Sequence, residues 1–254
     1  MHFRAFPPPA SLAPWVSMFW RLTGEGASEN FDTVLPDGSV ELIFHLGDPF
    51  MQSAGTTPAR QSRAFVVGDI RRPVSIRPAG RTDVIGVRFR PGRAYGCFRT
   101  PMAAIANGTT ALEDLTPACA WDRVAESADS MAFVATELQR MSARADEDRA
   151  LHACIDAIVK TNGAATVRCV AARVGLSVRQ LERKFAKGVG IPAKTFARVV
   201  RFHAVAERLR TQSVTAAAGY SDQPHLIREF REFSGMTPGD FLPRPGSLTE
   251  IFLG

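Results

Sequence analysis

Short runs of β-branched and aromatic residues alternate with turn-forming residues along the first 90 positions. Residue type and length predict five strands, at 16–22, 40–46, 64–67, 74–77 and 84–89. Gly, Pro and Asp separate these runs, as at 36–38 and 90–92. Many short strands divided by turns predict a small β-barrel or sandwich. Residues 48–63 are polar and rich in Gly, Pro, Ser and Thr, so we expect a mobile loop there.

The pattern becomes helical from about residue 91. Short helices are predicted at 92–98 and 101–106, and another at 112–115 leads into a longer helix over 120–141. Residues 142–146 form the best linker, and beyond them apolar residues recur at helical spacing from Leu151 to Val159. The chain is therefore predicted to be α+β, with a β-rich domain over 1–145 and an all-α domain over 146–254.

The last hundred residues contain one short pattern twice. Residues 171–177 read Ala-x-x-x-Gly-Leu-Ser and residues 215–221 read Thr-x-x-x-Gly-Tyr-Ser, each followed by an amphipathic helix that carries Arg on its outer face. The small residue lets two helices approach, and the glycine takes the positive φ of the turn between them. The repeat predicts two helix-turn-helix units in one domain.

The second helix of the first unit has a predicted cap and a predicted outer face. Ser177 is expected to cap the helix in a capping box with Gln180. The residues expected to face inward are Val178, Leu181 and Phe185, and those expected to face outward include Arg179, Glu182 and Arg183. In a major groove Arg can bind guanine and a carboxylate can accept from cytosine. A salt bridge from Glu182 to a neighbouring Arg is the alternative.

The second unit has a similar helix, which Ser221 or Asp222 is expected to cap and which runs to Ser234. Gln223 and Arg228 lie on its outer face and suit adenine and guanine. A long helix over 192–210 would hold the two units apart, as successive major-groove faces ~34 Å apart require. Phosphate-contacting or positioning roles are expected for Ser177, Gln180, Lys187, Lys194, Arg198, Arg201, Ser221, His225 and Arg231.

The charge of the chain is concentrated in the same region. Residues 1–146 hold 15 basic and 15 acidic residues, whereas residues 147–254 hold 16 basic and 10 acidic, so the whole net charge of +6 lies there. A local excess of this kind is typical of a protein that binds a polyanion. A solvated basic surface would give the same count. With the paired turns, the charge predicts double-stranded DNA as the partner.

Other classes of site receive little support from the sequence. The four cysteines, at 97, 119, 154 and 169, are too widely spaced for a zinc module or a disulfide framework, so buried reduced thiols are expected. The five histidines are not spaced as metal ligands, and we find no P-loop or G-x-S-x-G motif. We expect no metal, cofactor or enzyme activity. No apolar run reaches ~18 residues and the start lacks a signal-peptide core, so a cytoplasmic protein without membrane contact is expected.

The β-rich part offers one candidate pocket. Charged residues that could line an anion or small-molecule site are Glu41, Asp69, Arg71, Arg88 and Arg90, with ordinary surface ion pairing as the alternative. Three aromatic residues are expected to pack in the core and not to form a ligand cage: Trp15, Phe19 and Trp20. His45, on an alternating strand, is expected to be a packed or rim residue.

At the motifs quoted above, the chain resembles the AraC/XylS family of bacterial transcription regulators. The resemblance covers roughly residues 150–243 and is carried by 175–185, 189–192 and 218–238. It implies that Arg179, Glu182 and Arg183 read one set of bases and that Gln223 and Arg228 read another, in adjacent major-groove segments. It also implies recruitment or blocking of RNA polymerase. One departure is that only four residues separate Leu209 from Val214, about five fewer than usual, which would disturb the second unit.

The opening segments, 7–20 and 35–44, look like an uncharacterised N-terminal domain found on many such regulators. This resemblance implies a sensor or dimerisation domain, and so a small-molecule effector or a homodimer. Two other functions compete with sequence-specific regulation. One is a degenerate regulator that acts mainly through protein contacts, and the other is a DNA-repair enzyme that transfers alkyl groups, whose zinc-bound cysteines this spacing does not fit.

Overall fold

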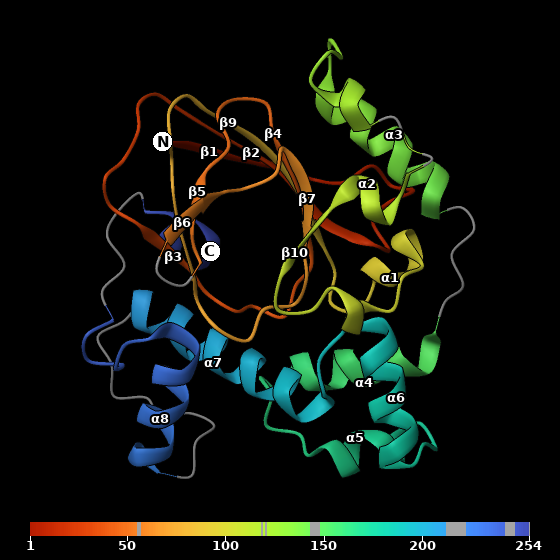
Figure 1. Cartoon of the computed structure of the whole chain (residues 1–254). Helices are drawn as coiled ribbons and strands as arrows, with labels where there is room; N and C mark the ends of the chain where they lie inside the picture. The colour runs from red at the N-terminus through yellow and green to blue at the C-terminus, as the bar shows by residue number, and fades with distance from the viewer. Residues whose placement is uncertain are drawn as a thin grey trace.

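The computed structural model describes residues 1–54, 57–117, 119, 121–142, 148–211, 222–241 and 247–253. The β-rich half comes first, the helical half follows, and the long helix α7 runs along the underside of the barrel (Figure 1). The α+β architecture predicted from the sequence is confirmed. The proposed domain boundary near residue 145 lies outside the described residues.

Two antiparallel sheets form the β-rich half, and they face each other as a barrel (Figure 1). The larger sheet has, in spatial order, β1 (His2–Phe6), β2 (Val16–Gly24), β9 (Thr82–Phe89), β4 (Glu41–His45), β7 (Ala64–Val67) and β10 (Thr109–Ala111). The smaller sheet has β3 (Asp32–Val34), β8 (Val74–Arg77), β5 (Met51–Ala54) and β6 (Thr57–Arg60). All five predicted strands are present, with ends shifted by at most two residues.

The prediction of a mobile loop over 48–63 is wrong. Strands β5 and β6 form an antiparallel hairpin in which Met51 pairs with Arg60, and β5 also pairs with β8. Strand β6 is an exposed sheet edge, where polar residues are normal, and this explains why the segment reads as a loop in the sequence.

The centre of the larger sheet depends on one glycine. Gly86 of β9 lies opposite Trp20 of β2, and a Cβ atom at this position would come within 1.9 Å of the indole ring. Glycine is therefore the residue that lets the Trp20 ring lie flat against the sheet and form part of the barrel interior.

Five short helical elements connect the barrel to the helical half. They are α1 (Ala94–Phe98), the 3-10 helix η1 (Met102–Ala104), α2 (Leu112–Leu115), the 3-10 helix η2 (Trp121–Val124) and α3 (Ser130–Ser142). The prediction of a single long helix over 120–141 is wrong for the first half of that range. The Asp129 carboxylate accepts the N–H groups of Met131 and Ala132, so the helix begins only at Ser130.

The helical half contains α4 (Arg149–Lys160), α5 (Val167–Arg173), α6 (Val178–Gly188), α7 (Ala193–Thr211), α8 (Gln223–Ser234) and α9 (Leu248–Leu253). It packs directly on the barrel half. Gly190, with a φ of 101°, lies so close to η1 that a Cβ atom would be 2.7 Å from the Met102 carbonyl oxygen. The chain then returns to the barrel, where α9 lies against β3.

The cysteines and the helices bear on two predictions from the sequence. The four cysteines are free thiols, but only Cys97 and Cys154 are buried, whereas Cys169 is exposed. Among the described helices, none combines the length and the apolar character that crossing a membrane requires.

Candidate DNA-binding surface and barrel cavity

The first predicted turn is present between α5 and α6. Ala171 is buried where the two helices meet, and Gly175 adopts a φ of 69°, as the turn requires. The capping box at the start of α6 is also present. The Gln180 N–H donates to Ser177 Oγ at 3.2 Å, and the Ser177 N–H donates to Gln180 Oε1 at 2.8 Å. The start and direction of α6 are therefore fixed by its own sequence.

Helix α6 presents part of the predicted reading face to solvent. Leu181 and Phe185 are fully buried and anchor the helix, whereas Arg179 and Arg183 are exposed. Val178 was expected to face inward, but it is 43% exposed because it lies on the open side of the first turn. One face of α6 is thus apolar and fixed, and the opposite face carries two outward guanidinium groups.

The expectation for Glu182 needs correction. Its carboxylate accepts the Ala193 N–H at 3.1 Å, at the start of α7. The two roles expected for Glu182 were base reading and a salt bridge to Arg179 or Arg183, and the contact with the Ala193 backbone is neither of these. A carboxylate at a helix N-terminus satisfies a backbone donor and complements the helix dipole, so Glu182 fixes the angle between α6 and α7.

Helix α8, the predicted second recognition helix, is capped by Asp222, whose carboxylate accepts the His225 N–H at 2.7 Å. Leu226, Phe230 and Phe233 are buried, and Gln223 and Arg228 are exposed. The turn before it, including Gly219 and Ser221, lies outside the described residues, as does most of its shortened supporting segment.

The residues proposed to contact phosphate differ in the contacts that they make within the protein. The exposed ones are Ser177, Gln180, Lys187, Lys194 and Arg231. Contacts within the protein join Ser177 and Gln180 to each other, Arg201 to the Gly163 carbonyl at 3.1 Å, His225 to Glu229 at 3.6 Å, and Lys187 to the Tyr95 ring at 4.8 Å. The phosphate role of exposed Lys194 and Arg231 stays a prediction.

Arg198 does not point outward as a phosphate ligand. Its Nε donates to Glu229 Oε2 at 2.7 Å, and its Nη2 donates to Glu232 Oε2 at 2.5 Å. The guanidinium also lies 5.1 Å from the centre of the Phe233 ring. Glu229 is only 1% exposed, so its carboxylate depends on this partner. Arg198 therefore joins α7 to α8.

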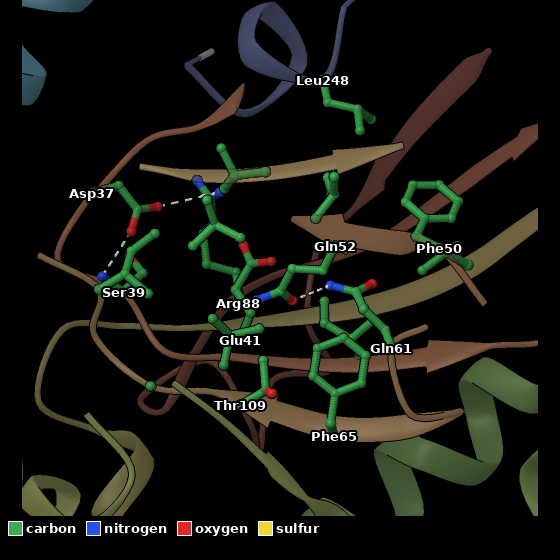
Figure 2. Close-up of a pocket in the computed structure, with 18 of the residues that line it drawn as sticks. Asp37, Ser39, Glu41, Phe50, Gln52, Gln61, Phe65, Arg88, Thr109 and Leu248 are labelled. Carbon is green, nitrogen blue, oxygen red and sulfur yellow. Dashed lines mark hydrogen bonds and ion pairs between the residues drawn. The ribbon is translucent and has the colours of Figure 1, made fainter. Parts of the chain in front are cut away.

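A cavity of about 130 Å³ lies between the two sheets of the barrel (Figure 2). Its apolar wall includes Trp20, Ile43, Phe50, Phe65, Ile76 and Val84. Leu248 of α9 closes one side, with no exposed surface. Trp20 was expected to be simply a core residue and instead forms part of this wall, whereas Trp15 and Phe19 belong to the core behind it.

One end of the cavity is charged. Arg88 Nε donates to Glu41 Oε1 at 2.6 Å, and Arg88 Nη2 lies 3.3 Å from Asp37 Oδ2 (Figure 2). Burial raises the pKa of Glu41 even though Arg88 acts against this. Of the five predicted charged residues, Glu41 and Arg88 line the cavity. The other three lie elsewhere: Asp69 is buried outside the lining, Arg71 donates to Asn107 Oδ1 and Arg90 donates to the Ala13 carbonyl.

The opposite end carries a chain of hydrogen bonds that the sequence did not suggest. His45 Nε2 lies 3.1 Å from Gln61 Oε1. Gln61 Nε2 donates to Gln52 Oε1 at 3.0 Å (Figure 2). Both glutamines belong to the segment that was expected to be a loop. Burial lowers the pKa of His45 to about 4, so the ring is neutral. His45 was expected to be a packed or rim residue because it alternates with residues 41 and 43 along one strand, and the structure places it, buried, in the cavity lining.

Comparison with known families gives two matches. The model of a domain of unknown function, DUF6597, matches residues 4–111, and the model of a helix-turn-helix domain matches residues 170–244. The second match covers α6 and α8, and its type is that of AraC regulators. No curated protein matches the chain.

Among solved structures, the chain is similar to the ToxT protein of Vibrio cholerae. One ToxT structure, in its P21 form, is 9% identical with a TM-score of 0.46, covering 87% of this chain and 97% of that one. ToxT of strain SCE256 with bound unsaturated fatty acid is 10% identical with a TM-score of 0.44, covering 87% and 94%. A similarity at this level is too weak to transfer a binding site.

Proposed function

We propose that this chain, in which an AraC-type helix-turn-helix domain follows a domain of unknown function, is a transcription regulator that reads DNA sequence through α6 and α8. The helical half, from about residue 146, would bind DNA, and the barrel half would sense a small molecule or form a homodimer. Recruitment or blocking of RNA polymerase would follow from the bound position.

The outer face of α6 carries this proposal. Arg179 and Arg183 lie four residues apart on an exposed helical face, and the capping box and the buried Leu181 and Phe185 hold that face rigid. Arg forms two hydrogen bonds with guanine in a major groove, which an α-helix fits. The geometry therefore supports Arg179 and Arg183 as base readers, with Glu182 as a positioning residue between α6 and α7.

Helix α8 is proposed as the second reader, through Gln223 and Arg228. Exposed Lys194 and Arg231 are proposed as phosphate contacts, which add affinity without sequence information. Arg198 and Glu229 would fix the angle at which α8 meets the DNA. This contact is one way in which α8 can be held despite its short support.

A gel-shift series on a selected DNA site tests base reading. Arg179→Ala and Arg183→Ala should each weaken binding by ~1–3 kcal/mol and relax the preference at one base position. Arg72→Ala removes the same charge from an exposed position on the barrel and serves as the matched control. Equal losses in all three variants, with unchanged base preference, would mean that the charge of α6 acts without reading sequence.

Lys194→Ala tests the phosphate role separately. The variant should bind every DNA sequence more weakly by a similar factor, and the slope of log K against log[salt] should fall by about one. Titrations of wild type and variant at several salt concentrations measure this slope. A change in base preference, or an unchanged slope, would exclude Lys194 as a phosphate contact.

A further inference from the structure

We infer that the barrel cavity binds a compact primary amine with a ring-sized apolar body and a hydrogen-bond donor at the end opposite the amine. The inference rests on the proposed function, because it identifies the effector class of the proposed regulator. It is drawn from the size of the cavity and from the chemistry of its two ends.

The size of the cavity limits the body of the ligand. An apolar cavity of about 150 Å³ can hold benzene, so about 130 Å³ of space suits one ring with short substituents. The rings of Trp20, Phe50 and Phe65 line this space, and they favour an apolar or aromatic body. Long acyl chains and large polar molecules do not fit.

The charged end carries more negative than positive groups. Asp37 and Glu41 share the one guanidinium of Arg88, which is the single Lys or Arg among the described lining residues. All three side chains are about 15% exposed, so solvent compensates them poorly. Burial raises the pKa of Glu41, the neighbouring Asp37 adds to this, and Arg88 acts against it. An ammonium group would supply the missing positive charge, and an anion would be repelled.

The opposite end offers an acceptor. With its Nε2 proton donated to Gln61, neutral His45 has a bare Nδ1, and this atom is buried without a hydrogen-bond partner among the described residues. His45 is 3% exposed and lines the cavity. A buried acceptor of this kind is costly unless a donor meets it. Glu41 and His45 lie four residues apart on β4, about 13 Å along the strand, so one end group cannot serve both sites.

A matched set of probes tests this inference on the full chain by calorimetry and thermal unfolding without DNA. Tyramine, tyrosol and 4-hydroxyphenylacetate share a phenol and differ in carrying an ammonium, a hydroxyl and a carboxylate. Tyramine should bind at least tenfold more tightly than tyrosol, and 4-hydroxyphenylacetate should not bind. Phenethylamine, which lacks the phenol donor, should bind more weakly than tyramine.

Two variants locate the interaction. Asp37→Asn keeps the shape of the side chain and should reduce the preference for tyramine over tyrosol about tenfold, whereas Asp114→Asn removes an exposed charge on α2 and should leave it unchanged. Binding of the carboxylate as tight as that of the amine, absence of tyramine binding, or an unchanged preference in Asp37→Asn would overturn the inference. Because these assays contain no DNA, they can fail while the gel-shift result stands, and the reverse also holds.

A second inference rests on α9. We infer that this helix couples the cavity to the second recognition helix. Leu248, at its start, lines the cavity and packs with Trp20 and Phe65, whereas Leu253, at its end, packs in the cluster that contains Phe230 and Phe233 of α8. The Thr249 hydroxyl donates to the Thr33 carbonyl of β3 at 2.6 Å. Six residues thus join the two cores, and a ligand that moves Leu248 would change the packing under α8.

Leu248→Trp, which adds volume to the cavity, tests the coupling. DNA affinity should change several-fold on a site with both base blocks and remain unchanged on a site whose second block is scrambled. Leu248→Met, which nearly keeps the volume, is the control and should behave as wild type. If Leu248→Trp does not fold, adding tyramine to wild type provides the same comparison. An equal effect on both sites, or no effect, would exclude coupling through α9 to α8.

Discussion

Burial of the His45 side chain determines its protonation state. The ring lies between Phe50 and Phe65, with centroid distances of 5.3 and 5.8 Å, and Gln61 is its hydrogen-bond partner. Burial lowers its pKa to about 4, Gln61 opposes this, and the nearby Arg63 adds to the lowering. In the neutral ring Nδ1 is an acceptor, and this atom is buried without a hydrogen-bond partner among the described residues.

This pKa predicts a pH dependence of stability. The unfolded chain takes up a proton at His45 near pH 6.5 and the folded protein only near pH 4, so the folded state binds fewer protons between these values. The free energy of unfolding should therefore fall by about 3 kcal/mol from this residue as the pH is lowered from about 7 to about 4.

Urea unfolding of wild type and His45→Gln across this pH range isolates the effect. Burial raises the pKa of Glu41 and Asp69, and these groups act in the opposite direction, so the difference between wild type and variant is the informative quantity. A difference that stays constant with pH would show that His45 is not held neutral.

Helices α7 and α8 are joined by Arg198, which forms one ion pair with a buried glutamate and another with an exposed glutamate. The Arg198 side chain is 26% exposed, and its partners Glu229 and Glu232 are 1% and 51% exposed. The buried half of this network matters more for stability. Without Arg198, Glu229 would be a buried carboxylate whose remaining ion-pair partner among the described residues is the His225 ring, 3.6 Å away.

Arg198→Ala should accordingly lower the free energy of unfolding by about 3 kcal/mol, at the low end for broken buried pairs because Arg198 is partly exposed. Glu232→Ala removes only the exposed half and should cost less than about 1 kcal/mol. Chemical denaturation of both variants measures the two values. Similar small losses in both would mean that the network does not hold α8.

The sequence predicted elements whose signals are local and missed those that depend on distant partners. The α6 capping box follows from neighbouring residues and is confirmed. Strands β5 and β6 were missed because their strand character comes from pairing, of β5 with β8 and of β6 with β5, which a polar sequence does not reveal. Glu182 and Arg198 were assigned to DNA because an outward helical position looks the same whether solvent or another helix faces it.

At the scale of the whole molecule, the long helix α7 lies between the reading helices and the cavity. Its buried residues Val199, Phe202 and Val205 share a cluster with Leu35, which also lines the cavity, and a Cβ atom at Gly38 would come within 2.8 Å of Phe196. The barrel half therefore contacts the DNA-binding half through the loop at 35–38 as well as through α9. These two contacts are the routes by which the proposed effector would act on the proposed DNA-binding helices.

Selection of bound sequences from random double-stranded DNA, with the full chain, tests the central claim most directly. We predict an enriched site with two base blocks about one helical turn apart. Guanines should occur in the block that α6 contacts, and Arg179→Ala and Arg183→Ala should lose this block while they keep the other. Failure to enrich any sequence, or variants that enrich the same two blocks as wild type, would contradict base reading by α6.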